Sequence, residues 1–156
     1  MNSKPIAATG LAWAVLSLLV CSQFTEKAIA ADPGLKLEAQ LIWGTNDPQS
    51  PDPSHKPVDS DVLKKLAALP LKWSNYFSVN RKGFNVPLTT TCKVPLSEKC
   101  RMEVKNLDGT RIEIALFGRG EQVLKRSQAL PKGEILVLAG NAPNDTAWLV
   151  TLKRIE

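Results

Sequence analysis

Residues 88–116, LTTTCKVPLSEKCRMEVKNLDGTRIEIAL, contain three runs in which apolar and polar side chains alternate. Alternation with a period of two is typical of strands that bury one face. The stretch therefore predicts three antiparallel strands that share an apolar face. The residues predicted on that face are Leu88, Thr90, Cys92 and Val94 in the first run, Cys100, Met102 and Val104 in the second, and Ile112, Ile114 and Leu116 in the third.

An Asp-Gly pair lies in the turn between the second and third strands. A two-residue turn there would pair Val104 with Glu113 and mix the two faces, whereas a three-residue loop over residues 107–109 pairs Val104 with Ile112. We therefore predict the longer loop, with Gly109 at a positive φ. That register sets like charges opposite each other on the outer face, which is unfavourable: Glu103 faces Glu113, and Lys105 faces Arg111.

The first 30 residues have the organisation of a secretory signal peptide. Lys4 supplies a positive charge, residues 11–20 (LAWAVLSLLV) form an apolar run too short for an ordinary membrane span, and residues 28–30 (AIA) match a cleavage motif. We expect a secreted or periplasmic mature chain, residues 31–156, that forms one β-rich domain without a transmembrane segment. Residues 18–21 (LLVC) also resemble a bacterial lipoprotein box, although the residue before the cysteine is bulkier than in such boxes.

Two cysteines remain in the predicted mature chain, and an even number in an exported protein favours a disulfide. If Cys92 faces Cys100, then Thr90 faces Met102, so the apolar sides of the two strands meet without a slip. We predict a bridge across this hairpin, which would stabilise the fold by about 2–3 kcal/mol. Two free thiols are the alternative.

Charge is unevenly distributed along the predicted mature chain. Residues 32–61 hold six acidic and two basic residues, a net charge of −4, whereas residues 62–156 hold 16 basic and eight acidic residues, a net charge of +8. A basic body suits an anionic envelope polymer, and an unknown protein partner is the alternative. The basic residues are scattered, as on any solvated surface, and no nucleic-acid motif is present, so no nucleic-acid partner is expected.

The rest of the chain predicts one short helix and further strands. The loop at residues 44–57 contains four prolines, which lack a backbone N–H and disfavour a strand. A helix is predicted at residues 59–69, with Asp59 as its N-cap and Pro70 at its end. Residues 134–139 and 147–152 are apolar on both faces and are predicted to be central strands. Other strands are predicted at residues 35–43, 72–81 and 122–130.

One short α-helix among about eight strands predicts a mainly β domain, either an antiparallel β-sandwich or a partly open barrel. The run NLDGTRIEIAL…LPKGEILVLAG, within residues 106–140, resembles immunoglobulin-like β-sandwich modules of exported bacterial proteins. In those modules a polar turn, a strand and a leucine-proline-x-glycine-glutamate turn recur. The resemblance implies a sandwich and no particular activity. The two cysteines depart from the antibody pattern, because they are too close together to bridge two sheets.

Motifs for catalysis or cofactor binding are missing from the sequence. His55 is the only histidine and lies in the proline-rich loop near Asp52 and Ser54, without a nucleophile motif, so we interpret it as a loop residue. The Asn and Asp residues of the loops could bind Ca²⁺, but they lack EF-hand spacing and residues of this kind more often form turns. We predict no catalytic residue, no metal site and no cofactor.

Aromatic side chains provide the remaining candidate site. Trp43 ends the first predicted strand, and Trp73 and Tyr76 begin another, so these three could form a binding patch with His55 of the adjacent loop. Packing in the core is the alternative for the three aromatic residues. Trp148, in an apolar strand, is predicted to lie in the core.

Together these observations predict an exported, non-enzymatic binding or structural module of the periplasm or cell surface. A small secreted hydrolase or an enzyme-inhibitor domain, with its site on the loops, is the alternative. A cleft that joins His55 to a second acid would favour the enzyme. An unpaired apolar edge strand would instead indicate an envelope assembly subunit.

Overall fold

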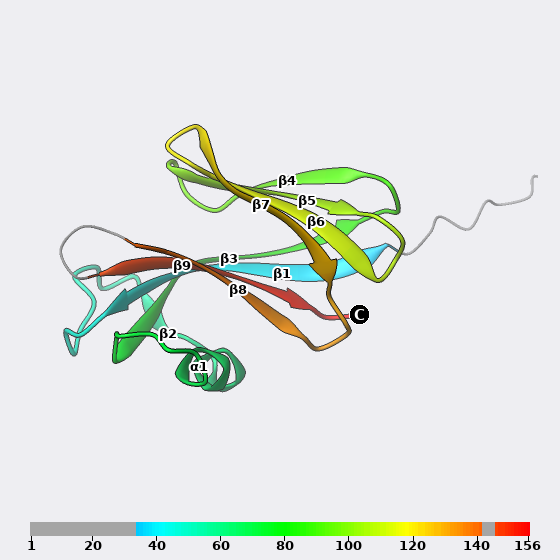
Figure 1. Ribbon diagram of the computed structural model, residues 1–156. Helices are drawn as coiled ribbons and strands as arrows, with labels where there is room; N and C mark the ends of the chain where they lie inside the picture. The colour runs from blue at the N-terminus through cyan, green and yellow to red at the C-terminus, as the bar shows by residue number, and fades with distance from the viewer. Residues whose placement is uncertain (1–33, 142–145) are drawn as a thin grey trace, which may run out of the picture.

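A computed structural model of the chain describes residues 34–141 and 146–156. These residues form two antiparallel sheets and one short helix in three layers, with the helix on the outer face of the larger sheet (Figure 1). The predicted mainly β sandwich with one helix is therefore confirmed. The five-stranded sheet has the order β2 (Lys56–Pro57), β3 (Asn75–Val86), β1 (Leu35–Thr45), β9 (Ala147–Arg154) and β8 (Ile135–Asn141), and the four-stranded sheet has the order β4 (Thr91–Pro95), β5 (Cys100–Asn106), β6 (Arg111–Gly118) and β7 (Glu121–Ala129).

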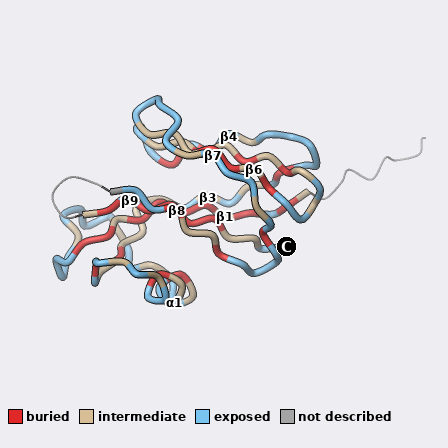
Figure 2. Tube along the Cα trace, viewed as in Figure 1, coloured by how far each residue is buried: buried red, intermediate tan, exposed pale blue. Residues whose placement is uncertain are grey.

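Buried residues occur in both sheets and in the helix (Figure 2). Their apolar side chains form two clusters on opposite faces of the five-stranded sheet. Strand β1 contributes to both clusters, because successive side chains of a strand point to opposite faces. Leu37 and Leu41 pack between the two sheets, whereas Ile42 packs beneath the helix. The five-stranded sheet is thus the middle layer, and β1 lies at its centre.

The helix α1 (Ser60–Ala67) is shorter at both ends than the predicted segment. Val62 and Leu66, one turn apart, are buried against the sheet. Asp59 occupies the N-cap position, but its side chain makes no capping hydrogen bond. The expected role of Asp59 was wrong because its carboxylate instead accepts a 2.5 Å hydrogen bond from Arg81 on β3.

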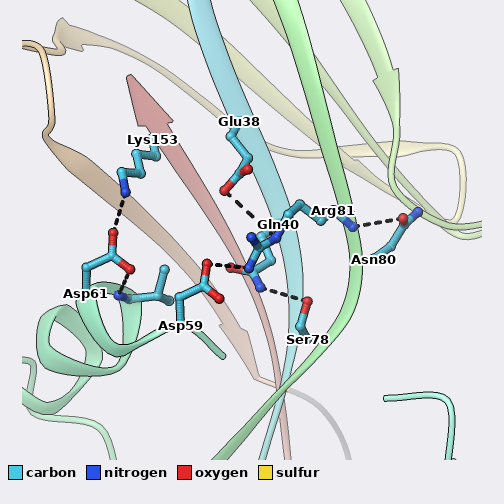
Figure 3. A network of polar contacts seen from close by, with 9 residues as sticks. Glu38, Gln40, Asp59, Asp61, Ser78, Asn80, Arg81 and Lys153 are labelled. Atoms are coloured by element: carbon cyan, nitrogen blue, oxygen red, sulfur yellow. Dashed lines mark hydrogen bonds and ion pairs between the residues drawn. The ribbon is translucent and has the colours of Figure 1, made fainter. Parts of the chain in front are cut away.

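Polar side chains attach the start of α1 to the sheet (Figure 3). Lys153 on β9 donates a hydrogen bond to Asp61, and the other carboxylate oxygen of Asp61 accepts one from the backbone N–H of Val62 at 2.9 Å. Nearby, the buried Gln40 donates to Ser78 Oγ at 2.7 Å. Its Oε1 has no hydrogen-bond partner among the described residues. The helix is therefore held by ion pairs at its start and by apolar packing along its length.

Several predicted strand boundaries were wrong. Strand β4 begins at Thr91, so Leu88 lies before it and is exposed instead of lying on the apolar face. Strand β3 begins at Asn75 rather than Lys72, and it does not end at Arg81 but continues to Val86, because Gly83 pairs with Glu38 in the middle of the β1–β3 ladder. The proline-rich loop ends in the two-residue strand β2, which pairs with β3 at the sheet edge. Proline is tolerated there because an edge strand needs hydrogen bonds on one side only.

The β5–β6 hairpin has the predicted faces but not the predicted pairing. Val104 lies opposite Ile114 rather than Ile112. A shift of two residues leaves every side chain on its original face, so the shared apolar face survives the change. On the outer face, Lys105 now lies opposite Glu113, which replaces the unfavourable like-charge pairs with an opposite-charge pair.

The turn of this hairpin explains the shift in pairing. Asn106 is buried, and its amide donates to the carbonyl of Val86 at 3.1 Å while its Oδ1 accepts from the N–H of Gly109 at 2.8 Å. Asp108 Oδ1 accepts from the N–H of Arg111 at 2.7 Å and from that of Thr110 at 2.9 Å, and these bonds hold the pKa of Asp108 below its usual value. Gly109 has a φ of +85°, as predicted.

Gly109→Val should destabilise the protein by about 1–2 kcal/mol, because the position has a backbone conformation that β-branched residues disfavour. Gly83→Val is the matched control, since Gly83 lies in a strand without a positive φ and a Cβ there would meet no atom within 4 Å. Urea midpoints of the two variants would test this. Equal losses would show that the backbone conformation of Gly109 is not the cause.

Asp61→Asn should lower the urea midpoint at pH 7, by an amount that diminishes in acid. The hydrogen bond from Lys153 holds the pKa of Asp61 below its usual value. The folded state thus favours the carboxylate, so its stabilising effect is present above the ordinary pKa of about 3.9 and is lost as the pH falls below it. Midpoints of the wild type and the variant between neutral and strongly acidic pH would measure this, and a difference independent of pH would contradict it.

Candidate functional site

Cys92 and Cys100 are free thiols, and the predicted disulfide was wrong. The β4–β5 turn brings the N–H of Leu96 to the carbonyl of Cys100 at 2.9 Å, whereas Cys92 pairs with Val104. Cys100 therefore lies four residues along β4 from Cys92, about 13 Å at the rise of a strand, and a disulfide needs Cα atoms within about 7 Å. Both thiols pack against the sandwich core, and burial raises the pKa of Cys100.

The predicted patch of Trp43, His55, Trp73 and Tyr76 is not assembled. Trp73 and Tyr76 are buried beneath the helix, where the Tyr76 hydroxyl donates to the Trp73 carbonyl at 2.9 Å. Gly44 makes room for the tyrosine ring, because a Cβ there would lie 3.3 Å from Tyr76 Cε1. Trp43 points to the opposite face of the sheet, so the core alternative holds for Trp73 and Tyr76 but not for Trp43.

Trp43 instead belongs to a row of residues that crosses all five strands of the larger sheet. Each member pairs directly with the next, so all lie on one face, the one that looks toward the four-stranded sheet. The rings of Trp43 and Trp148 meet edge to face, with centroids 4.7 Å apart. We call this set the aromatic row; its members are Pro57, Phe77, Trp43, Trp148 and Gly140.

The aromatic row lies where the second sheet stops covering the first. Asn80 on β3 donates to the carbonyl of Leu96 at 2.7 Å, which brings the β4–β5 turn over the position next to the row. Beyond this point the two sheets diverge toward the end where β1 finishes and β9 begins (Figure 1). Trp148 is 43% exposed, so its prediction as a core residue was wrong, and Trp43 is half-buried.

The side chain of Trp43 has a hydrogen-bond donor that is not used. Its Nε1 is buried and has no hydrogen-bond acceptor in the described part of the chain. A buried indole N–H normally finds a partner, and a buried donor without one costs about 1–3 kcal/mol. Neither the exposure of Trp148 nor this orphaned donor contributes to stability.

The proline-rich loop brings a serine, a histidine and an aspartate together. Ser50 Oγ lies 2.7 Å from Nδ1 of His55, and Asp52 Oδ2 lies 3.6 Å from its Nε2. Ser54 was the serine expected near His55 from the sequence, whereas the structure places Ser50, five residues before the histidine, against the ring. The ring could accept a proton from Ser50, but the Asp52 carboxylate lies beyond hydrogen-bond distance and its side chain is 51% exposed. The chemistry of this loop is therefore that of a weakly oriented Ser-His pair.

Two shallow hollows lie elsewhere, along strand β8. One, of about 320 Å³, is lined by residues 70–73 and Ala139. The other, of about 190 Å³, is lined by Lys65, Leu69, Gln128 and residues 134–137. Neither hollow includes the His55 loop or a member of the aromatic row.

Within residues 34–141 and 146–156, no three His, Cys, Asp or Glu residues gather as they would around a metal ion. The one helix described there falls short of the length and apolar character needed to cross a bilayer.

Comparison of the chain with protein-family models, with curated proteins and with solved structures gives no match. The resemblance of residues 106–140 to immunoglobulin-like modules therefore stays a prediction, and the candidate sites are the aromatic row and the Ser-His pair of the proline-rich loop.

Proposed function

We propose that this protein is an exported, non-enzymatic binding module of the periplasm or cell surface, and that it holds its partner on the aromatic row. The observation that carries the proposal is the 43% exposure of Trp148 beside Trp43. Tryptophan is enriched among the residues that dominate binding energy, because it buries a large apolar area and loses little rotamer freedom. In the neighbouring inward row Leu41, Val150 and Leu138 are buried, whereas Trp148 is open to solvent.

The charges near the row favour a protein partner over an anionic polymer. The β4–β5 and β6–β7 turns meet at this end of the sandwich, where the N–H of Arg119 donates to the carbonyl of Lys99 at 2.8 Å. Both side chains are exposed, but the same two turns also carry Glu98 and Glu121. Opposite charges are thus balanced on these two turns, which suits an apolar protein surface better than a polyanion.

A hydrolase is the second candidate, and the 2.7 Å contact between Ser50 and His55 is the observation in its favour. A serine whose hydroxyl is held by a histidine is the starting arrangement of nucleophilic catalysis. The contact also has a structural explanation, because Ser50 Oγ accepts from the N–H of Asp52 at 3.4 Å and so helps to shape the loop.

Trp148→Ala should lower the affinity for the partner at least tenfold, a loss of about 1.4 kcal/mol or more, while leaving the fold intact. Immobilised wild type and variant would be compared for what they retain from envelope extracts, followed by titration of the retained protein. Leu63→Ala is the matched control, since Leu63 is 45% exposed but lies on the helix. If the wild type and Trp148→Ala retain the partner equally, the aromatic row is not part of the binding surface.

Ser50→Ala and His55→Ala should leave the rate of ester hydrolysis at its background value, because the main proposal assigns no catalysis to this loop. The measurement is cleavage of p-nitrophenyl acetate by purified protein. Ser54→Ala serves as the control from the same loop. A rate that falls a hundredfold in the first two variants, and is unchanged in the third, would favour the hydrolase.

A further inference from the structure

The outer edges of the two sheets differ in how well they are protected against pairing with another strand. Exposed edges are normally blunted by short strands, proline or charged side chains. On the far edge of the larger sheet, β2 has two residues, one of them Pro57, and the part of β3 with which β2 does not pair carries Arg81 and Lys82. In the smaller sheet, β4 ends in Pro95 and contains Lys93, and β7 carries charged side chains. The remaining edge, β8, is seven residues long and has neither a proline nor a charge, ILVLAGN.

Strand β8 was predicted to be central because both of its faces are apolar, and that prediction was wrong within the described chain. Ile135 packs beneath the helix, and Leu138 packs between the sheets, so each face is covered. The strand is nevertheless paired on one side only, with β9. Its composition is that of an interior strand, whereas its position is that of an edge.

The open edge presents unused backbone groups at alternate residues. The N–H of Arg154 donates to the carbonyl of Glu134 at 3.2 Å, so the residue just before β8 directs its carbonyl toward β9. In an antiparallel ladder this direction alternates, so Ile135, Val137 and Ala139 direct their N–H and C=O groups away from β9. In the described part of the chain, no loop or second strand supplies backbone hydrogen bonds to these three residues.

We infer that β8 pairs in antiparallel fashion with β8 of a second copy of this chain, about a two-fold axis beside Val137. Val137 then lies opposite Val137 of the second copy, and Ile135 lies opposite Ala139. These are the residues whose backbone groups point outward, so each free donor meets a free acceptor. The pairing joins two five-stranded sheets into one, and it closes after two copies because the same surface is used on both.

The charges and the shape of the β8 edge favour a second copy of this chain as the partner that pairs with it. Glu134 would lie opposite Gly140 of the second copy, and its carboxylate is already bound by Lys65 at 2.9 Å, so no like charges meet. The hollow along Glu134–Val137 is about 190 Å³, below the usual size of a small-molecule pocket. Leu69 forms part of the apolar wall of this hollow, and the paired strand and helix of the second copy would cover that wall. The pairing and the aromatic row share only Gly140, because the pairing uses the backbone groups of Ile135, Val137 and Ala139 rather than the exposed tryptophan.

The mass of the purified protein in solution tests the pairing. Light scattering from about 1 µM to about 100 µM should show a dimer that dissociates on dilution. Ala139→Lys places a charge on the open edge at an exposed position and should raise the dissociation constant at least tenfold. Val123→Lys is the matched control, because Val123 is 62% exposed on the β7 edge, and it should leave the dimer unchanged.

A cross-link tests the register itself. In a background with Cys21→Ala, Cys92→Ala and Cys100→Ala, Val137→Cys should form a covalent dimer on mild oxidation, since a directly opposed pair has Cα atoms about 5.5 Å apart. Ala139→Cys should not, because the two copies of that residue would lie four positions apart, about 13 Å.

Three results would overturn the inference. These are a wild type that is monomeric at every concentration, a dimer unaffected by Ala139→Lys, and equal cross-linking at both cysteine positions. A monomer that instead binds an extended apolar peptide, in a manner blocked by Ala139→Lys, would assign this edge to another protein and not to a second copy.

Discussion

Strand β1 must bury both of its faces, and the other layers are arranged around that requirement. Leu37 and Leu41 point to one side of the strand, and Ile42 points to the other. Each fully buried side chain of this kind contributes about 1.5–3 kcal/mol, so neither face can be left in water. The four-stranded sheet covers one face, and α1 covers the other. An eight-residue helix is too short to be stable alone, and it persists because it completes this second core.

The same alternation of faces also decides which aromatic residues are available to a partner. Tyr76 and Phe77 are adjacent on β3, so one must point toward the helix and the other toward the second sheet. Tyr76 is buried in the helix-side core, whereas Phe77 joins Trp43 and Trp148 in the aromatic row. The divergence of the two sheets then leaves Trp148 exposed. The candidate binding surface thus arises from one unfilled row at the end of the sandwich.

Strand β8 shows that apolar faces and a central position are separate properties. A strand with two apolar faces needs cover above and below, and the helix and the second sheet supply it here. Hydrogen bonding at its outer edge is a different requirement, and β8 lacks that partner in the described chain. The aromatic row and the β8 edge use different forces, the first apolar contact and the second backbone hydrogen bonds. One module could therefore hold a partner and pair with a copy of itself.

Local pattern determined the described strands other than β2, the position of the helix and the positive φ of Gly109, because each depends on residues close together in the chain. The shared face of β5 and β6 was also predictable, since a shift of two residues preserves it. The pairing itself was decided by tertiary structure: buried Asn106 bonds to Val86 on another strand, and the β4–β5 turn separates Cys92 from Cys100. Whether Trp73 or Trp148 is exposed depends on how far the helix and the four-stranded sheet extend over the five-stranded sheet. The alternation of side chains along one strand contains no information about the extent of the layer that covers that strand.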